Sequence, residues 1–331
     1  HYFKNLISIL NRKGHKIIIT AVDKDITFDL LNRYNLDFIS LGKHYSNIFK
    51  KIISLFRNEL KLFFISIKYK PDIYVSFHSP YPAHVGWFLR KKVISITDTE
   101  HAKLSNYLTN PFSDIILTPN CFQENFGKKH IKFNSFIELS YLHPKYFKPN
   151  KNILNLLGIK RNERYSILRF ISWDAWHDRG QRGLSLKMKR KAVYELSKFG
   201  KVFISSESKL PEDLQKYKLK IPHERIHDAL YYASLFFGES GTMSTESAIL
   251  GTPTVRVSSL AKLLGNFKEL HHKYDLINYY DNPTFGLEKC IEILNDNNSK
   301  LLWQKKSQEC IKDKIDITKY LVDIIIGGKN E

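Results

Sequence analysis

The sequence predicts an α/β protein built from two doubly wound, Rossmann-type domains that face each other across an interdomain cleft. Short β-branched runs alternate with amphipathic helical patterns along most of the chain, which indicates parallel sheets covered by helices. The chain has 331 residues, a length suited to about two domains. The alternation stops over residues 135–150, where Pro144 and Pro149 occur, and then resumes. We therefore expect an N-terminal domain at 1–140 and a C-terminal domain at 150–331, and leave open whether the last helices pack back on the first domain.

The first half begins with a helical pattern over Phe3–Lys13 that ends at Gly14, a usual helix-terminating residue. Doubly wound domains normally begin with a strand, so we expect a further strand and loop upstream of His1. The same two periodicities predict strand Lys16–Val22, helix Asp25–Tyr34, strand Asp37–Leu41, a long helix within Lys43–Lys70, strand Ile73–Phe77, helix Ala83–Arg90, strand Val93–Thr97, helix Glu100–Thr109 and strand Asp114–Thr118.

The second half repeats the alternation and then ends in helices. Ligands of such folds bind at the carboxyl ends of the strands. The predicted elements are strand Tyr165–Ile171, helix Leu184–Phe199, strand Val202–Ser205, helix Arg225–Ala233, strand Leu235–Gly238, helix Thr242–Leu250, strand Thr254–Val257 and helices near Lys300–Lys314 and Thr318–Ile326.

The charge balance points to anionic partners. Lys and Arg number 52 and Asp and Glu 33, which gives a net charge of +19. Such an excess favours nucleic acid, phospholipid surfaces or phosphate-bearing small molecules. The chain is also rich in Lys, Asn and Ile throughout, so a general compositional bias explains the charge equally well. We find no nucleic-acid recognition motif and expect no specific nucleic-acid partner.

The cysteines and apolar runs bear on localisation. The three cysteines are an odd number, lie far apart and form no C-x-x-C, which is typical of a reducing compartment. No apolar run approaches the ~18 residues of a membrane span, and no signal-peptide pattern opens the chain. We expect a cytoplasmic protein, with a peripheral position on the inner face of the membrane as an option.

That option comes from the Lys43–Lys70 stretch. It carries seven basic residues and one acid, Glu59, interleaved with apolar residues at helical spacing. One interpretation is a domain helix with its apolar face in the core. The other is a helix that lies on an anionic membrane surface.

The strongest motif runs from Phe237 to Pro253. A buried strand ends at Gly238, and the small residues Ser240, Gly241 and Thr242 open a helix. Free amides at a helix start hold a phosphate, and small side chains let it approach the backbone. Glu246, one turn further, carries a carboxylate suited to ribose hydroxyls. A plain strand–turn–helix with Ser and Thr caps is the alternative.

This segment resembles the nucleotide-binding signature of GT-B glycosyltransferases and the related UDP-N-acetylglucosamine 2-epimerases. The resemblance implies that Ser240 and Gly241 contact a diphosphate and that Glu246 holds a ribose. Almost end to end, the chain is similar to an uncharacterised GT-B-like family, a domain of unknown function, of bacteria and archaea. The stretches that carry this similarity are His1–Leu6, Ser79–Val85, Thr97–Lys103, Arg169–Ala175 and Gly238–Pro253.

Two further strand ends carry candidate functional residues. The loop after the second domain's first strand carries cations and aromatics: Arg169, Trp173, His177 and Arg179. These side chains suit a pyrophosphate and a sugar or base ring. The alternative is a solvated loop without a binding role. In the first domain Asp98, Glu100 and His101 follow a strand and can act as general base and acid, or cap the next helix. His78 and His84 flank another strand end and are expected to line the same cleft.

We expect no metal and no cofactor. His223-Glu224-Arg225-Ile226-His227 fits the H-E-x-x-H zinc pattern. However, Pro222 places it at the very start of a helix, and the pattern is short enough to arise by chance. Asp98-Thr99-Glu100 matches an Asp-x-Asp metal site only loosely.

The sequence therefore predicts a glycosyltransferase that uses a nucleotide-diphosphate sugar, of UDP type, in cell-surface glycan biosynthesis. Two alternatives stay open: an epimerase-like enzyme that acts on the sugar nucleotide itself, and a non-catalytic binder of nucleotide sugars or polyanions.

Overall fold

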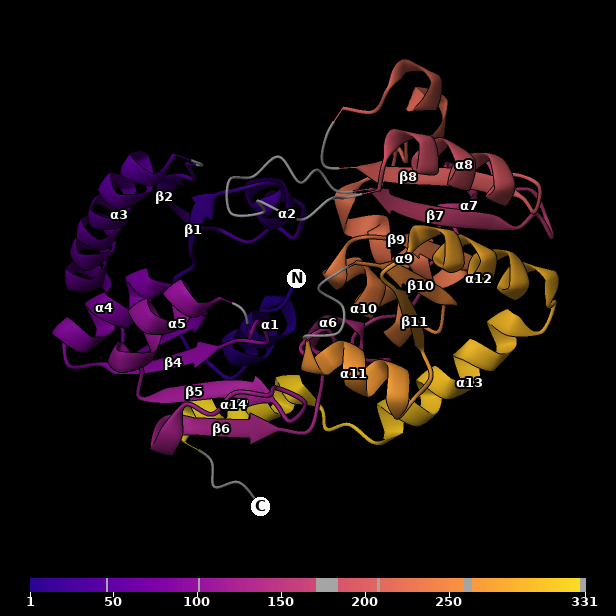
Figure 1. Ribbon diagram of the computed structural model, residues 1–331. Coiled ribbons are helices and arrows are strands. Elements are labelled where there is room, and N and C mark those ends of the chain that lie inside the picture. Colours follow the sequence, from indigo (N-terminus) through magenta and orange to yellow (C-terminus); the bar gives the residue numbers. More distant parts are fainter. Residues whose placement is uncertain (46, 101, 171–183, 207–208, 259–263, 328–331) are drawn as a thin grey trace. The chain divides into compact units, whose positions relative to one another are not determined.

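A computed structural model describes residues 1–45, 47–100, 102–170, 184–206, 209–258 and 264–327 (Figure 1). The chain forms two compact units. Unit 1 comprises His1–Tyr141 and Ile315–Glu331, and unit 2 comprises Leu142–Lys314.

Unit 2 is built on a five-stranded parallel sheet with the order β11-β10-β9-β7-β8. Its strands are β7 (Tyr165–Phe170), β8 (Lys201–Ser206), β9 (Leu235–Gly238), β10 (Thr254–Val257) and β11 (Ile277–Tyr280). Every residue of β9 and β10 is buried, as expected for central parallel strands that have helices on both faces.

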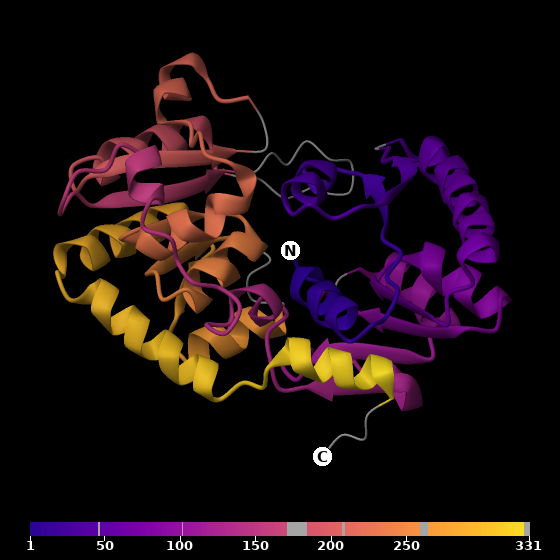
Figure 2. The ribbon, with the colours of Figure 1, turned by 180° about the vertical axis from the view of Figure 1, so that it is seen from behind.

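Helices cover both faces of this sheet. α12 (Pro283–Asn295) packs on β9–β11 and on α8 (Leu186–Leu196). α10 (Gly241–Ile249) packs on β10, and α13 (Ser299–Lys312) packs on α10 (Figure 2). The remaining helices in the described part of unit 2 are α7 (Ile153–Leu156), α9 (Ile226–Tyr232), α11 (Gly265–His272) and the short 3-10 helices η4 (Glu212–Tyr217) and η5 (His223–Arg225).

Unit 1 contains two parallel sheets, β1-β2 and β3-β4-β5-β6. The strands are β1 (Thr20–Asp23), β2 (Ile39–Lys43), β3 (Ile73–Phe77), β4 (Lys92–Ile96), β5 (Ile115–Pro119) and β6 (His130–Phe133). The described helices are α1 (Lys4–Arg12), α2 (Thr27–Arg33), α3 (Ile48–Tyr69), α4 (Pro80–Phe88), α5 (Lys103–Thr109) and α14 (Ile317–Ile326). Two 3-10 helices, η1 (Asn110–Phe112) and η2 (Gly127–Lys129), also belong to unit 1, and α6 (Leu139–Leu142) lies at the unit boundary.

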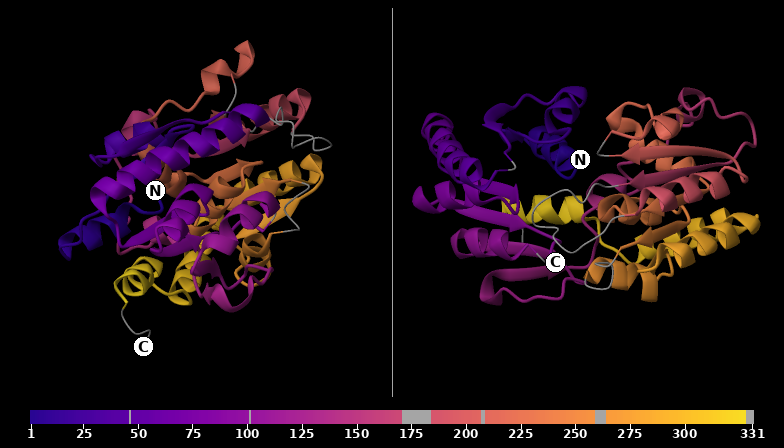
Figure 3. Two further views of the ribbon diagram at one scale, coloured as in Figure 1. Left: turned by 90° about the vertical axis from the view of Figure 1, so that its left-hand side faces the viewer. Right: turned by 45° about the horizontal axis from the view of Figure 1, so that its top comes forward.

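The C-terminal helix α14 belongs to unit 1, although it follows unit 2 in the chain (Figure 3). It packs on α1. Thr318 Oγ1 donates to the carbonyl of Ser140 at 3.0 Å, and Ser135 Oγ donates to the carbonyl of Ile315 at 3.1 Å. These bonds and the burial of Leu321 and Val322 fix the helix to the unit.

Most predicted elements are confirmed, and several were missed. The first strand is shorter than the predicted Lys16–Val22, since β1 begins at Thr20. The helices α7, α11 and α12 and the strands β6 and β11 were not predicted. The stretch interpreted as a linker carries α6, and Phe136, Leu139 and Tyr141 within it are fully buried, because its apolar side chains pack into the core.

Gly238 lets β7 and β9 approach closely. A Cβ atom added there would lie 2.4 Å from the carbonyl oxygen of Arg169, which is backbone and cannot move aside. We therefore expect Gly238→Ala to lower the free energy of unfolding by about 1–3 kcal/mol, measured by urea unfolding. The control is Gly241→Ala, where the nearest atom would be at 3.4 Å, an ordinary contact. Equal stability of Gly238→Ala and the wild type would contradict this account.

Candidate functional site

The candidate site of unit 2 lies at the carboxyl ends of β7 and β9. From β7 the chain crosses to β8 on one side, and from β9 it crosses to β10 on the other. Since β7 and β9 are neighbours, their two connections leave in opposite directions. Such a switch point leaves a crevice outside the strand ends, which is where open α/β sheets bind ligands.

The N-terminus of α10 opens at this switch point. Ser240 is the N-cap, and its Oγ accepts from the amide of Met243 at 3.4 Å. Ser240 and Gly241 are half-buried and Thr242 is exposed, so this end of the helix can be reached from solvent. The amides of Gly241 and Thr242 have no acceptor within the helix, by helix geometry. With the helix dipole they favour an anion.

Arg256 of β10 lies beneath this helix end. Its side chain is 4% exposed, and its guanidinium carbon lies 4.0 Å from the ring centre of Phe267. A Cβ atom added to Gly241 would lie 3.7 Å from Nη2 of Arg256. Arg256 was not predicted as a site residue; its signal in the sequence is a single arginine within the apolar strand Thr254–Val257.

The charge of Arg256 is not balanced within the described chain. No described residue accepts a hydrogen bond from its Nε or Nη1, and burial lowers the pKa of Arg256 to about 10. The neighbouring buried carboxylate Glu239 is engaged elsewhere, since its Oε1 accepts from the amide of Leu184 at 2.7 Å. A buried unpaired charge is costly, so the arrangement favours a bound anion.

Glu246, the predicted ribose ligand, lies inside the unit. Its side chain is 6% exposed, and its Oε1 lies 3.0 Å from Nε2 of His227. This pair also accounts for the second histidine of the H-E-x-x-H pattern. In the described ranges, no group of three or more His, Cys, Asp and Glu residues is arranged to hold a metal ion. The ribose role of Glu246 stays a prediction.

Arg169 is the last residue but one of β7, and its Nη1 donates to Oγ of Ser205 on β8 at 2.7 Å. The other three residues predicted for this loop, Trp173, His177 and Arg179, lie outside the described residues.

In unit 1 the predicted residues follow β3 and β4. Asp98 is half-buried and its Oδ1 accepts from the hydroxyl of Thr99 at 2.9 Å. Glu100 is 8% exposed, and its Oε1 accepts from the amide of Gln123 at 3.2 Å. Since β3 and β4 are parallel neighbours, these residues and His78 all follow the carboxyl ends of adjacent strands, on the same side of the sheet. His101 lies outside the described residues.

The two predicted cleft histidines have different positions. His78 is 9% exposed and has a left-handed φ of 45°. Its Nε2 lies 3.1 Å from Oδ1 of Asn110, and burial lowers its pKa. His84 lies among helices instead. Its Nδ1 is 2.5 Å from Oε1 of Glu59 on α3, and its Nε2 is 2.8 Å from the carbonyl of Leu108 on α5.

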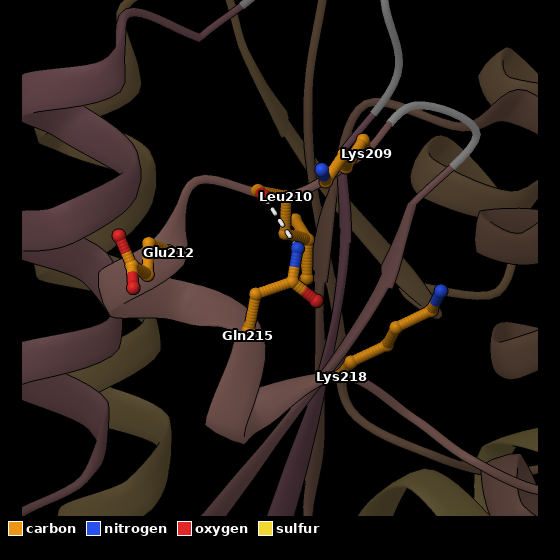
Figure 4. A pocket seen from close by; sticks show the side chains of 5 residues that line it. All are labelled: Lys209, Leu210, Glu212, Gln215 and Lys218. Atoms are coloured by element: carbon orange, nitrogen blue, oxygen red, sulfur yellow. Dashed lines mark hydrogen bonds between the residues drawn. The ribbon is translucent and has the colours of Figure 1, made fainter.

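A separate hollow of about 500 Å³ follows β8 in unit 2. All its lining residues come from Lys209–Lys218, and Gln215 donates across it to the carbonyl of Leu210 (Figure 4). Glu212 points away from Lys218. None of the predicted site residues lines it, and we assign it no role.

The parallel sheets and the helix start at the switch point define a protein of GT-B-like fold. The UDP-GlcNAc 2-epimerase of Neisseria meningitidis, solved with UDP-GlcNAc, aligns with a TM-score of 0.67 at 12% identity over 99% of this chain and 97% of that one. The glycosyltransferase SsfS6 of Streptomyces sp. SF2575, solved with thymidine diphosphate, aligns with a TM-score of 0.60 at 13% identity over 98% and 95%.

The chain belongs to the family described as "Protein of unknown function (DUF354)", whose sequence profile matches residues 1–327. A relative from Methanocaldococcus jannaschii, "Uncharacterized protein MJ0665", is 28% identical over 310 residues, which cover 91% of this chain and 89% of that protein. The predicted family and fold class are thereby confirmed.

We expect Arg256→Met to raise the unfolding free energy of the ligand-free protein by about 1 kcal/mol or more, because it removes an uncompensated buried charge and keeps the side-chain volume. The matched control is Arg225→Met. Arg225 forms an ion pair at 2.5 Å with Asp228, which is 8% exposed on its side chain, so its loss leaves that carboxylate unpaired and destabilises. The measurement is chemical unfolding of both variants. A clear loss of stability in Arg256→Met would show that the guanidinium is compensated within the protein.

Proposed function

We propose that this chain is a glycosyltransferase that uses a nucleotide-diphosphate sugar, with the donor's diphosphate held between the N-terminus of α10 and Arg256. The observation that carries the proposal is the buried guanidinium next to a solvent-reachable helix start. A guanidinium presents paired donors that match two phosphate oxygens. A neutral ligand would leave the buried charge unbalanced.

The comparisons support the same ligand class. One protein of similar fold was solved with UDP-GlcNAc and another with thymidine diphosphate, and both ligands carry a nucleoside diphosphate. The resemblance of Gly238–Pro253 to the GT-B signature supports a contact of Ser240 and Gly241 with the diphosphate. These similarities are to distant sequences, so the base and the sugar stay open.

The proposed reaction needs a base and a stabilised leaving group. An acceptor hydroxyl attacks the anomeric carbon, the bond from that carbon to the phosphate oxygen breaks, and the nucleoside diphosphate leaves with the electron pair. Arg256 and the α10 amides offset the negative charge that develops on it. We assign the base role to Asp98, because Glu100 is more deeply buried and already accepts a backbone amide.

An epimerase-like reaction is the second candidate. It is supported by the similarity to the epimerase of Neisseria meningitidis at a TM-score of 0.67. An epimerase changes the sugar nucleotide without any acceptor, whereas a transferase releases nucleoside diphosphate only when an acceptor is present. Chromatography of nucleotide sugars incubated with the protein, with and without acceptor glycans, separates the two. Binding without either product would indicate a non-catalytic nucleotide-sugar binder.

Two substitutions test the diphosphate site. We expect Arg256→Met to weaken UDP or dTDP binding by about tenfold or more, because it removes hydrogen bonds to a charged group, each worth about 1.5–3 kcal/mol. We expect Gly241→Ala to weaken it as well, because the added methyl group occupies the space through which the diphosphate approaches the backbone. Gly241→Ala adds a methyl group between the helix start and Arg256 without a clash. Calorimetry measures the affinities.

The matched ligand control is the free nucleoside, whose weak binding should be the same in both variants and the wild type. If both variants fold and bind the diphosphate as tightly as the wild type, the proposed diphosphate site is wrong.

We expect Asp98→Asn to abolish turnover and leave UDP affinity within about twofold, because the substitution removes the base and keeps the side-chain shape. The measurement is product formation beside calorimetry. Full turnover in Asp98→Asn would move the base role to another residue.

A further inference from the structure

α3 of unit 1 faces the solvent with its apolar side. Seven apolar side chains along the helix are between 49% and 74% exposed: Phe49, Ile52, Ile53, Phe56, Leu60, Phe64 and Ile67. Their spacing of three and four residues places them on one side of a helix. The opposite side, which is buried, carries Ser54, Asn58, Leu62 and Ser66 at intervals of four. The usual arrangement of a surface helix is therefore reversed.

The apolar surface continues onto α4. Phe63 links the two helices, with its ring centre 5.8 Å from that of Phe64 and 5.8 Å from that of Phe88. Phe88 is 68% exposed and its neighbour Trp87 is 59% exposed. We call this surface, the seven α3 residues with Trp87 and Phe88, the α3/α4 apolar face. Contiguous apolar surface of this kind on a folded protein marks an interaction site.

Cations lie beside the apolar stripe. Lys50, Arg57, Lys61 and Lys68 are exposed and spaced by seven, four and seven residues, which places them on one flank of the stripe. The one acidic residue of α3, Glu59, is paired with His84. Within the described ranges, no carboxylate forms an ion pair with any of these four cations. An exposed apolar stripe with a cationic flank is the pattern of helices that lie in a membrane interface.

We propose that the α3/α4 apolar face docks on a bilayer that contains anionic phospholipid, with the α3 helix lying in the plane of the interface. Acyl chains cover the apolar stripe and lipid phosphates meet the four cations. The helix does not span the bilayer; no helix in the described part of the chain has the length and apolar content for that. The proposal is independent of the proposed enzymatic function.

A second copy of the chain fits this face less well. In a symmetric dimer the same face would meet itself, and the cationic flanks of the two α3 helices would come together without acids to balance them. An anionic lipid surface offers the opposite charge over the whole length of the helix.

Vesicle co-sedimentation of the full chain tests the proposal. We expect the protein to bind vesicles of equal parts phosphatidylglycerol and phosphatidylcholine, to bind pure phosphatidylcholine much more weakly, and to be released by salt. The variant Phe56→Ser/Leu60→Ser/Phe64→Ser should lose binding. The variant Lys50→Gln/Lys61→Gln/Lys68→Gln should lose about fivefold in affinity per lysine on the anionic vesicles.

The matched controls lie in unit 2. Tyr194→Ser/Phe285→Ser/Leu301→Ser changes apolar side chains of similar exposure, and Lys187→Gln/Lys191→Gln/Lys305→Gln changes exposed lysines. Both should bind like the wild type. Melting temperatures confirm folding, and all these substitutions are at exposed positions, so stability should not fall.

Trp87 gives a second readout. Lipids brominated on the acyl chain should quench its fluorescence on binding, and the difference between wild type and Trp87→Phe isolates that signal. The proposal is overturned if wild type fails to bind anionic vesicles at low salt, or if the apolar variant binds as well as wild type. It is also overturned if light scattering shows a dimer that the apolar variant disrupts while vesicle binding is absent.

Discussion

The buried guanidinium of Arg256 beneath the N-terminus of α10 is the electrostatic constraint around which the site of unit 2 is arranged. A helix N-terminus carries positive potential, so a cation placed there is repelled by the helix as well as deprived of water. Partial relief comes from the Phe267 ring at 4.0 Å. A dianionic ligand would relieve both sources of positive potential together, which is why we interpret the arrangement as a phosphate site.

The parts of the fold that were predictable from the sequence are those with a local signal. Strand Leu235–Gly238 has the predicted bounds, because a buried parallel strand is a continuous apolar run with sharp ends. Strand Ile73–Phe77 also has the predicted bounds; its β-branched and aromatic residues gave the signal, although only every second residue is buried. The two missed strands, β6 and β11, are both at sheet edges. Their sequences, His-Ile-Lys-Phe and Ile-Asn-Tyr-Tyr, mix polar and apolar residues because one side of the ladder is open. The edge strands β3 and β8 were predicted, because their apolar runs are less interrupted, so the weak local pattern of β6 and β11 explains the two misses and edge position alone does not.

The same distinction applies to the site. Ser240 and Gly241 could be identified because a strand, small residues and a helix follow one another directly. The role of Arg256 can be inferred only from the fold, because the sheet places it beneath Gly241, which lies fifteen positions earlier in the chain. The pairing of His227 with Glu246 across nineteen positions is of the same kind. For α3, periodicity predicts an amphipathic helix but not which side is buried, since that depends on what the sheet can accommodate.

The reversed orientation of α3 has a cause in packing. A general surplus of apolar residues in the chain does not explain it. Ser66 lies against Tyr74 of β3, and Leu62 belongs to a core cluster with Leu41 of β2 and Tyr74. The buried side is filled by Ser54, Asn58, Leu62 and Ser66, so turning the bulkier phenylalanines inward would overpack it. The buried side thus explains the small polar residues, but it does not require aromatic residues on the other side. Polar residues there would be neutral for packing and favourable for solubility. The apolar stripe and Arg256 each lie wholly within one unit, and under our two proposals each is covered by a ligand of matching polarity.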